Sequence, residues 1–300
     1  MAPSTLRRIL RDPETEDVRA DPRRAAGRGF VALRDGVTHH EIAGPEGAPV
    51  VVLVHGFSVP LYLWDTIFQP IAAAGFRVLR YDLFGRGLSD RPDARYDEEL
   101  YDRQLAGLLA AVGVDAPVHL VALSLATSVC STFVARRPRL VRSLAFLGAG
   151  FGAGRRAPRR LRAPLVGEIL MAGRVAPTLA ESQRDDLHRP DRHPEWADRY
   201  RDQMRYRGFR RALLSTLRHY LGRDVEADYR RVAASGLPVL LSWGAFDRRV
   251  PPGDRARIAA LVPRAEVLEV PDAGHLPSVE APAVVVAALV DFLRRADVPR

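Results

Sequence analysis

The stretch that decides how this chain is interpreted is Val118-His-Leu-Val-Ala-Leu-Ser-Leu-Ala-Thr127. It begins with residues 118–123, a run of mostly apolar and β-branched side chains that is typical of a buried strand. Residues 125–137 follow without Gly or Pro, are rich in small and apolar side chains, and stop at Pro138, as a helix does. The pattern therefore predicts a strand, a tight turn with Ser124 at its apex, and a helix.

A serine in such a turn is suited to nucleophilic chemistry. The turn holds the residue in a strained backbone conformation so that its hydroxyl stands clear of the sheet, and small neighbours let strand and helix approach. The usual pattern is Gly-x-Ser-x-Gly, whereas this chain has Ala122 and Ala126 where the glycines would be. Two interpretations stay open, a working variant of the turn or a protein of this shape whose activity is reduced or redirected.

Length and composition indicate a chain that can bury one large core. Its 300 residues, 47% of them hydrophobic, allow a single domain or a domain with an insertion. The single cysteine, Cys130, excludes an internal disulfide and suits a reducing compartment. No apolar stretch approaches the ~20 residues of a membrane span, and the apolar part of an export signal is missing near the N-terminus. We therefore expect a cytoplasmic protein without stable membrane insertion.

The net charge of +9 is concentrated in one part of the chain. All 45 basic residues are arginine, and residues 151–231 contain 19 of them against 11 Asp plus Glu. A surface of mixed charges is the first interpretation, and a cationic approach to an anionic substrate or interface is the second. Because no nucleic-acid motif accompanies the arginines, we expect no nucleic-acid partner.

Strand and helix patterns alternate along most of the chain, which predicts a mostly parallel α/β sheet flanked by helices. The expected strands are residues 29–34, 38–43, 50–54, 77–82, 118–123, 142–147, 238–243 and 265–270. The expected helices are residues 64–74, 97–112, 125–137, 165–173, 203–221, 253–261 and 283–295.

The alternation of strands and helices is interrupted once. Residues 151–231 have helical segments but no strong strand pattern, so we predict an Arg-rich helical cap inserted there. The core then consists of residues 29–150 and 232–300. Residues 1–28 are polar and carry prolines and charges of both signs, from which we expect a mobile or loosely packed extension.

A serine hydroxyl needs a general base, which in turn needs a carboxylate to orient it. His275 is our candidate base because it lies in a loop just past the strand expected at 265–270. Asp247 is the candidate carboxylate because it also follows a core strand, while Asp272 is a weaker competitor. The chain order Ser, Asp, His is that of folds built around such a turn.

An oxyanion formed at Ser124 needs two preorganised donors. We expect the backbone N–H groups of Leu125 and Phe57 to supply them, and His55 to hold its loop by hydrogen bonding. Trp64 and Phe151 are candidates for lining a substrate pocket. This chemistry requires no metal and no cofactor, and we expect neither.

Several further segments stand in a characteristic order along the chain. They are Leu53-Val-His-Gly-Phe57, Trp64, Tyr81-Asp-Leu-Phe-Gly-Arg-Gly-Leu-Ser-Asp-Arg-Pro92, the turn at Ser124, Trp243-Gly-Ala-Phe-Asp247, Gly274-His275 and Glu280-Ala-Pro282. With them the chain resembles the α/β-hydrolase superfamily over about residues 29–295, specifically its cap-bearing bacterial carboxylesterase and acylglycerol-lipase-like members. The resemblance implies that residues 82–92 form a structural loop near the site. Members with dehalogenase or epoxide hydrolase activity carry Asp in the turn, so Ser124 argues against both activities.

Three hypotheses about function follow. The first is a serine hydrolase that cleaves small-molecule carboxylic esters, with an apolar acyl group, through an acyl-enzyme. The second is hydrolysis of a C–C bond in a ring-fission diketone by the same residues, with cap arginines holding a substrate carboxylate. The third is a binding module or a non-hydrolytic participant in a biosynthetic pathway, for which Ala122 and Ala126 are the only support.

Overall fold

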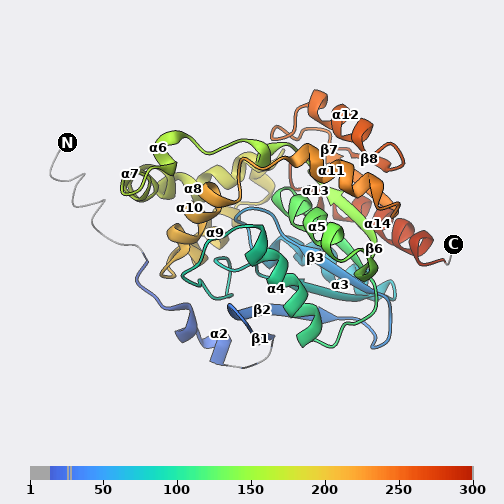
Figure 1. The fold of residues 1–300 in the computed structure, drawn as a ribbon, viewed down its shortest axis with the longest axis horizontal. Helices are drawn as coiled ribbons and strands as arrows, with labels where there is room; N and C mark the ends of the chain where they lie inside the picture. Colours follow the sequence, from blue (N-terminus) through green and yellow to red (C-terminus); the bar gives the residue numbers. More distant parts are fainter. Residues whose placement is uncertain (1–13, 26, 28, 299–300) are drawn as a thin grey trace.

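The centre of the molecule is one eight-stranded sheet (Figure 1), seen in a computed structural model that describes residues 14–25, 27 and 29–298. The strand order is β1-β2-β4-β3-β5-β6-β7-β8. The first two strands are antiparallel to their neighbours and all later neighbours are parallel, which confirms the predicted mostly parallel sheet. The strands are β1 (Phe30–Leu33), β2 (Gly36–Ala43), β3 (Val50–Val54), β4 (Arg77–Tyr81), β5 (Val118–Leu123), β6 (Val141–Leu147), β7 (Val239–Gly244) and β8 (Glu266–Val270).

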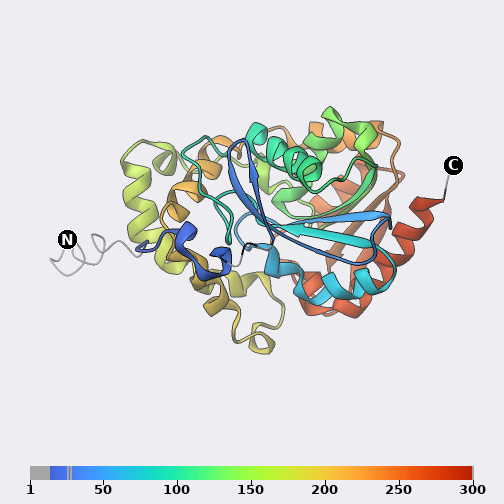
Figure 2. The same cartoon turned by 90° about the horizontal axis from the view of Figure 1, so that it is seen from below.

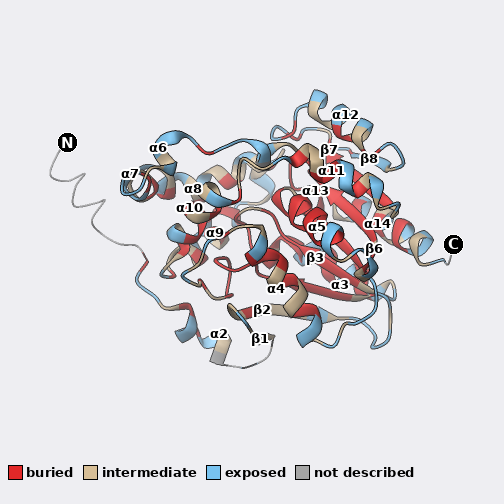
Figure 3. Ribbon diagram, in the orientation of Figure 1, coloured by how far each residue is buried: buried red, intermediate tan, exposed pale blue. Residues whose placement is uncertain are grey.

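Helices cover both faces of this sheet, as Figure 2 shows. One face packs against α3 (Asp65–Ala73) and α14 (Pro282–Asp297), and the other packs against α4 (Glu98–Ala111), α5 (Leu125–Arg136) and α11 (Val225–Ala234). Figure 3 shows that the buried residues gather at the centre of the molecule, on the sheet and the helices around it. Every residue of β5 is buried, which explains the nearly continuous apolar run in its sequence. Two further helices, α12 (Pro252–Leu261) and α13 (Pro277–Glu280), follow β7 and β8.

A helical insertion lies between β6 and β7, and none of the sheet's strands comes from its described residues. Besides 3₁₀ turns and α11 it contains α6 (Arg159–Arg162), α7 (Val166–Leu170), a π-helical turn (Met171–Val175), α8 (Ala176–Ser182), α9 (Trp196–Met204) and α10 (Phe209–His219). The prediction of one helix over 203–221 is wrong, because Gly208 has φ 89° and separates α9 from α10.

The N-terminal segment differs from the expected loose extension. Residues 14–25 form two short helical turns that pack against the insertion. Glu16 makes an isolated parallel β-bridge with Tyr206, and Val18 is buried against the same tyrosine. Local composition indicated mobility, but these tertiary contacts order the segment. The rest of the expected extension includes residues 1–13, 26 and 28, which lie outside the described residues.

Candidate functional site

Ser124 lies in the turn between β5 and α5 with φ 53° and ψ −117°. This backbone conformation is uncommon for a residue with a side chain and persists only where surrounding contacts enforce it. The Ser124 N–H donates to the Leu147 carbonyl at 2.9 Å, and the Ser124 carbonyl accepts from the N–H and hydroxyl of Thr127 at 3.0 and 2.8 Å. The turn is therefore held from β6 on one side and from α5 on the other.

The alanines on either side of Ser124 fit into this turn without displacing it. Ala122 and Ala126 are both 0% exposed and belong to the apolar core beneath α4 and α5. The strained conformation of Ser124 is present with both methyl groups in place. The two methyls are thus part of the core packing.

His275 and Asp247 meet through a direct hydrogen bond. The His275 Nδ1 lies 2.9 Å from one carboxylate oxygen of Asp247, while the other oxygen accepts from the N–H groups of Arg249 and Val250 at 2.8 and 3.1 Å. Burial opposes the charged form of both residues, but their mutual hydrogen bond and opposite charges outweigh it. The pKa of Asp247 therefore lies below its ordinary value, and the pKa of His275 lies above its own.

Two glycines make room for this pair. Gly148 directly follows β6 and has φ 59°, and a Cβ on it would lie 2.9 Å from the Cε1 of His275. Gly244 ends β7, and a Cβ there would lie 2.1 Å from the Gly274 carbonyl oxygen. Both positions require glycine because the His275 loop crosses directly over the strand ends.

Two cavities meet at Ser124. Both are lined by Phe57, Ser124, Gly152, Arg249 and His275, so the predicted nucleophile and base share one space. The first cavity, of about 220 Å³, is completed by Leu125, Ser128, Gly148, Gly150, Leu217, Leu221 and Val250. The second, of about 360 Å³, is completed by Gly56, Ser58, Val59, Leu123, Leu179, Ser182, Gln183, Asp186 and Leu276. Side chains of the insertion therefore form part of the wall of each cavity.

The two predicted oxyanion donors border this space. Phe57 and Leu125 both line the first cavity, and neither backbone N–H has an acceptor within the part of the chain that the structure describes. Arg86, which sequence reasoning did not single out, fixes the Phe57 loop because its Nε donates to the Phe57 carbonyl at 2.9 Å. Its guanidinium is fully buried and also donates to Thr216 of α10 at 3.0 Å.

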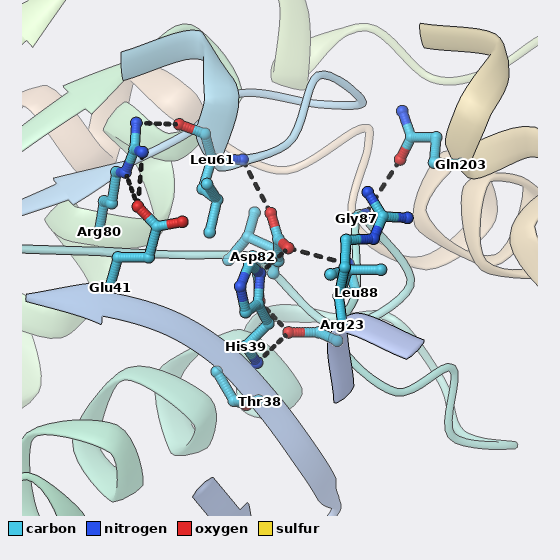
Figure 4. A network of polar contacts seen from close by, with 12 residues as sticks. Arg23, Thr38, His39, Glu41, Leu61, Arg80, Asp82, Gly87, Leu88 and Gln203 are labelled. Carbon is cyan, nitrogen blue, oxygen red and sulfur yellow. Dashed lines mark hydrogen bonds and ion pairs between the residues drawn. The ribbon is translucent and has the colours of Figure 1, made fainter. Parts of the chain in front are cut away.

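The loop that begins at Asp82 is held by a buried polar network, which Figure 4 shows. One oxygen of the Asp82 carboxylate accepts from the Leu61 N–H at 2.8 Å. Its other oxygen accepts from the Leu88 N–H at 2.9 Å and lies 2.7 Å from the His39 Nδ1. Burial acts to raise the pKa of Asp82, but the hydrogen bond and charge of His39, the charge of His55 and the Leu61 N–H together outweigh it, and the net pKa is lowered. The acidic group is therefore a structural anchor of the loop.

His55 holds the neighbouring loop, as predicted from its place beside Gly56. Its Nε2 accepts from the Leu83 N–H at 2.9 Å, and its Nδ1 lies 2.9 Å from the Gly56 carbonyl oxygen, to which it can donate. Complete burial lowers the pKa of His55 to about 4, so the ring stays neutral near pH 7. It orients the chain that leads to Phe57.

A second residue that sequence reasoning did not assign, Glu280, ties the His275 loop to the insertion. Its carboxylate accepts from the Gly274 N–H at 2.6 Å and from the N–H groups of His188 and Arg189 at 2.7 and 2.9 Å. In the sequence, Glu280 stood out only as part of Glu280-Ala-Pro282, one of the segments on which the family resemblance rests.

The structure places three other candidates outside the site. Trp64 is fully buried in the core beneath α3, and Phe151 packs edge-on against Tyr229 at 5.7 Å, so neither lines the cavities at Ser124 as predicted. Phe151 lies close to the first cavity in the chain, since its neighbours Gly150 and Gly152 both line it. Asp272 is an exposed turn residue with φ 53°, and Asp247 is the carboxylate that reaches His275.

Comparisons with known proteins agree with this architecture. The profile of the alpha/beta hydrolase fold matches residues 49–282. The chain is 27% identical to Lipase 1 of Psychrobacter immobilis over 84% of this chain and 78% of that protein. It is 28% identical to a 2-hydroxy-6-oxononadienedioate/2-hydroxy-6-oxononatrienedioate hydrolase of Cupriavidus pinatubonensis, over 88% and 94% of the two chains.

Among solved structures, a thermophilic esterase from Thermogutta terrifontis superposes with a TM-score of 0.75 and 25% identity, covering 89% of this chain and 98% of that one. No helix within the described ranges has the length and apolar character needed to cross a membrane. The fold, the order of its motifs and the family profile together show that the chain belongs to the α/β-hydrolase family.

Proposed function

We propose that this protein is a serine hydrolase that cleaves carboxylic esters through an acyl-enzyme intermediate. One observation supports this most strongly. Ser124, in its strained turn, opens on two cavities that also contain His275, and His275 is hydrogen-bonded to the buried Asp247. Two cavities that meet at one hydroxyl suit a substrate with two parts joined at a carbonyl. Leucines on their walls, such as Leu179 and Leu217, favour an apolar acyl group.

The proposed reaction begins when the Ser124 hydroxyl oxygen attacks the ester carbonyl carbon and His275 takes the hydroxyl proton. Since the His275 Nδ1 is held by Asp247, the base is the other ring nitrogen, Nε2. The N–H groups of Phe57 and Leu125 donate to the oxyanion, each contributing about 3 kcal/mol in the transition state. The C–O bond then breaks, and the alcohol leaves with the proton from His275.

Water completes the proposed cycle. It attacks the acyl carbon while His275 accepts one of its protons, and a second tetrahedral oxyanion forms between the same two N–H groups. The bond to the Ser124 oxygen breaks, the serine regains its proton from His275, and the carboxylic acid is released. Similarity to a lipase and to an esterase, each matched over most of both chains, supports this choice of substrate class.

A second candidate reaction is hydrolysis of a C–C bond in a ring-fission diketone by the same residues. Similarity to the Cupriavidus pinatubonensis hydrolase over nearly its whole length favours it. Arg249 adds a specific observation, because it lines both cavities and could hold a substrate carboxylate. Its guanidinium is already paired with Asp186, however, so an anionic substrate would have to compete with that contact. We rank the ester reaction first for this reason.

The test is an activity comparison of the wild type with Ser124→Ala. We expect a fluorophosphonate probe to label only the wild type, and hydrolysis of short and medium acyl esters to fall roughly 10⁴-fold or more in the variant. Turnover of a ring-fission diketone with negligible ester hydrolysis would reverse the ranking. Failure to label or to hydrolyse either class would refute the proposal and leave a binding role, the third hypothesis.

A further inference from the structure

The arginines of the insertion differ in whether a carboxylate neutralises them. Most of those on α9, α10 and α11 are paired with carboxylates, as Arg199 and Arg218 are. In α6, by contrast, Arg159, Arg160 and Arg162 are all exposed, and none makes an ion pair within residues 14–25, 27 and 29–298. Other exposed arginines of the described insertion, such as Arg174 and Arg192, also lack an ion pair, but α6 carries three such arginines within four residues.

Large apolar side chains are exposed immediately beyond these arginines. Leu165, Val166 and Ile169 are 78%, 45% and 61% exposed. Val166 and Ile169 are three residues apart and therefore share one face of α7, and Leu165 directly precedes this helix. The opposite face is packed, because Gly167 is buried and a Cβ on it would lie 2.2 Å from the Leu161 carbonyl oxygen. The apolar face is therefore turned to solvent while α7 is fixed from behind.

Leu165 also has an unusual backbone. It has φ 62°, and the only other non-glycine residues in the described chain with positive φ are Ser124 and Asp272. A large aliphatic residue in the left-handed region is unfavourable locally, and its exposure to water is a second unfavourable contribution. Transfer of the side chain to an apolar phase would remove the second contribution.

We propose that the basic-apolar surface, formed by Arg159, Arg160, Arg162, Leu165, Val166 and Ile169, docks this protein on an anionic lipid–water interface. The guanidinium groups would contact headgroup phosphates, and the aliphatic face of α7 would enter the boundary with the acyl chains. Charge complementarity identifies the anionic surface. The aliphatic side chains favour lipid over nucleic acid, in which they would have no apolar partner.

The position of this surface fits such a role. Helices α6 and α7 lie at one end of the molecule (Figure 1) and rest on α10, where Arg218 donates to the carbonyls of Leu161 and Ala163. Leu217, the neighbour of Arg218 on α10, lines the first cavity. The same helix thus supports the docking surface and contributes to the wall of the site. Docking itself does not depend on whether Ser124 hydrolyses esters.

The experiment is sedimentation of the full-length protein with lipid vesicles. Binding to phosphatidylcholine vesicles that contain phosphatidylserine is expected to exceed binding to pure phosphatidylcholine and to weaken as salt is added. The double variant Leu165→Ser/Ile169→Ser and the triple variant Arg159→Gln/Arg160→Gln/Arg162→Gln should each lower the partition coefficient roughly tenfold or more. Because all five side chains are exposed, the variants should keep the wild-type Tm.

Matched controls separate this surface from general charge and hydrophobicity. Val267→Ser removes an apolar side chain that is 60% exposed on β8. Arg34→Gln/Arg139→Gln/Arg264→Gln removes the same charge from exposed positions elsewhere. Both controls should bind vesicles like the wild type.

Three results would overturn the proposal. One is the absence of vesicle binding, and another is an equal loss of binding in the controls and in the surface variants. The third is a dimer of the wild type that only the Leu165→Ser/Ile169→Ser variant dissociates, without any dependence on lipid. That outcome would identify the surface as a contact between two copies of the chain.

Discussion

At the scale of single residues, the ionisation of His275 connects structure to the proposed activity. Only the neutral imidazole can accept a proton from Ser124. Burial lowers the pKa of His275, while the hydrogen bond and charge of Asp247 raise it; Asp186 also raises it and Arg249 lowers it. The net pKa lies above the ordinary value of 6.5. The activity of the wild type should therefore fall as pH drops through a midpoint higher than that of a free imidazole.

Asp247→Asn should change both the size and the midpoint of this pH profile. Without the carboxylate, burial acts on His275 with less opposition, so the acid limb of kcat/KM should move to lower pH. The plateau should fall by roughly 10⁴-fold because the imidazolium loses its partner. Asp272→Asn, in an exposed turn of the same loop, should leave plateau and midpoint unchanged. An unshifted midpoint in Asp247→Asn would contradict the assignment.

At the scale of elements, the junction of β5 and α5 carries the departure from the usual Gly-x-Ser-x-Gly pattern. Ala122 lies near the end of β5, and Ala126 lies in the first turn of α5. Both residues are fully buried. Their methyl groups contribute to the packing of sheet against helix, while contacts from Leu147 and Thr127 hold the turn itself. From this geometry we expect the two alanines to stabilise the fold through their packing.

Replacing either alanine with glycine should destabilise the protein without improving it as an enzyme. Ala126→Gly should lower the free energy of unfolding by about 1–2 kcal/mol, through lost helix propensity and a lost buried methyl. Ester kcat/KM should stay within about threefold of wild type. Ala135→Gly, at an exposed position of α5, measures the propensity effect alone by urea unfolding. A tenfold gain in kcat/KM in Ala122→Gly or Ala126→Gly would instead mean that the methyls restrain Ser124.

At the scale of the whole molecule, the insertion and the core are joined directly behind the site. The Glu280 carboxylate accepts three N–H groups, one from Gly274 and two from the insertion. The His275 N–H in turn donates to the Asp186 carbonyl of the insertion at 2.7 Å. The position of the imidazole is thus coupled to the docking of the insertion.

Glu280→Gln should weaken both the docking of the insertion on the core and the positioning of the His275 imidazole. The amide offers one acceptor oxygen in place of two, which leaves a backbone N–H unsatisfied at a cost of about 1–3 kcal/mol in unfolding free energy. Displacement of the His275 loop should lower kcat by roughly tenfold with a smaller change in KM. Glu269→Gln, on the exposed face of β8, should behave like wild type. Wild-type stability and kcat in Glu280→Gln would show that the three hydrogen bonds are dispensable.

Much of this architecture could be predicted from the sequence. All eight strands lie within two residues of their predicted ends, because each strand is marked by a local run of apolar and β-branched residues. Ser124, Asp247 and His275 could be selected because each follows a core strand, and the ends of parallel strands meet at one edge of the sheet. The single helix over 203–221 was wrong because Gly208, with its positive φ, separates two helices. The contacts of residues 14–25 could not be predicted because they involve Tyr206, which lies far away in the chain.

By itself, the sequence determined the sheet, its family and the order of the reactive side chains, since these depend on local periodicity and on strand ends. Only the tertiary structure decided what surrounds Ser124. Burial of Trp64, packing of Phe151 against Tyr229, support of Phe57 by Arg86, and the fit of two methyl groups beside the turn all involve residues far apart in the chain. Such contacts depend on the three-dimensional packing of side chains, which no local pattern specifies.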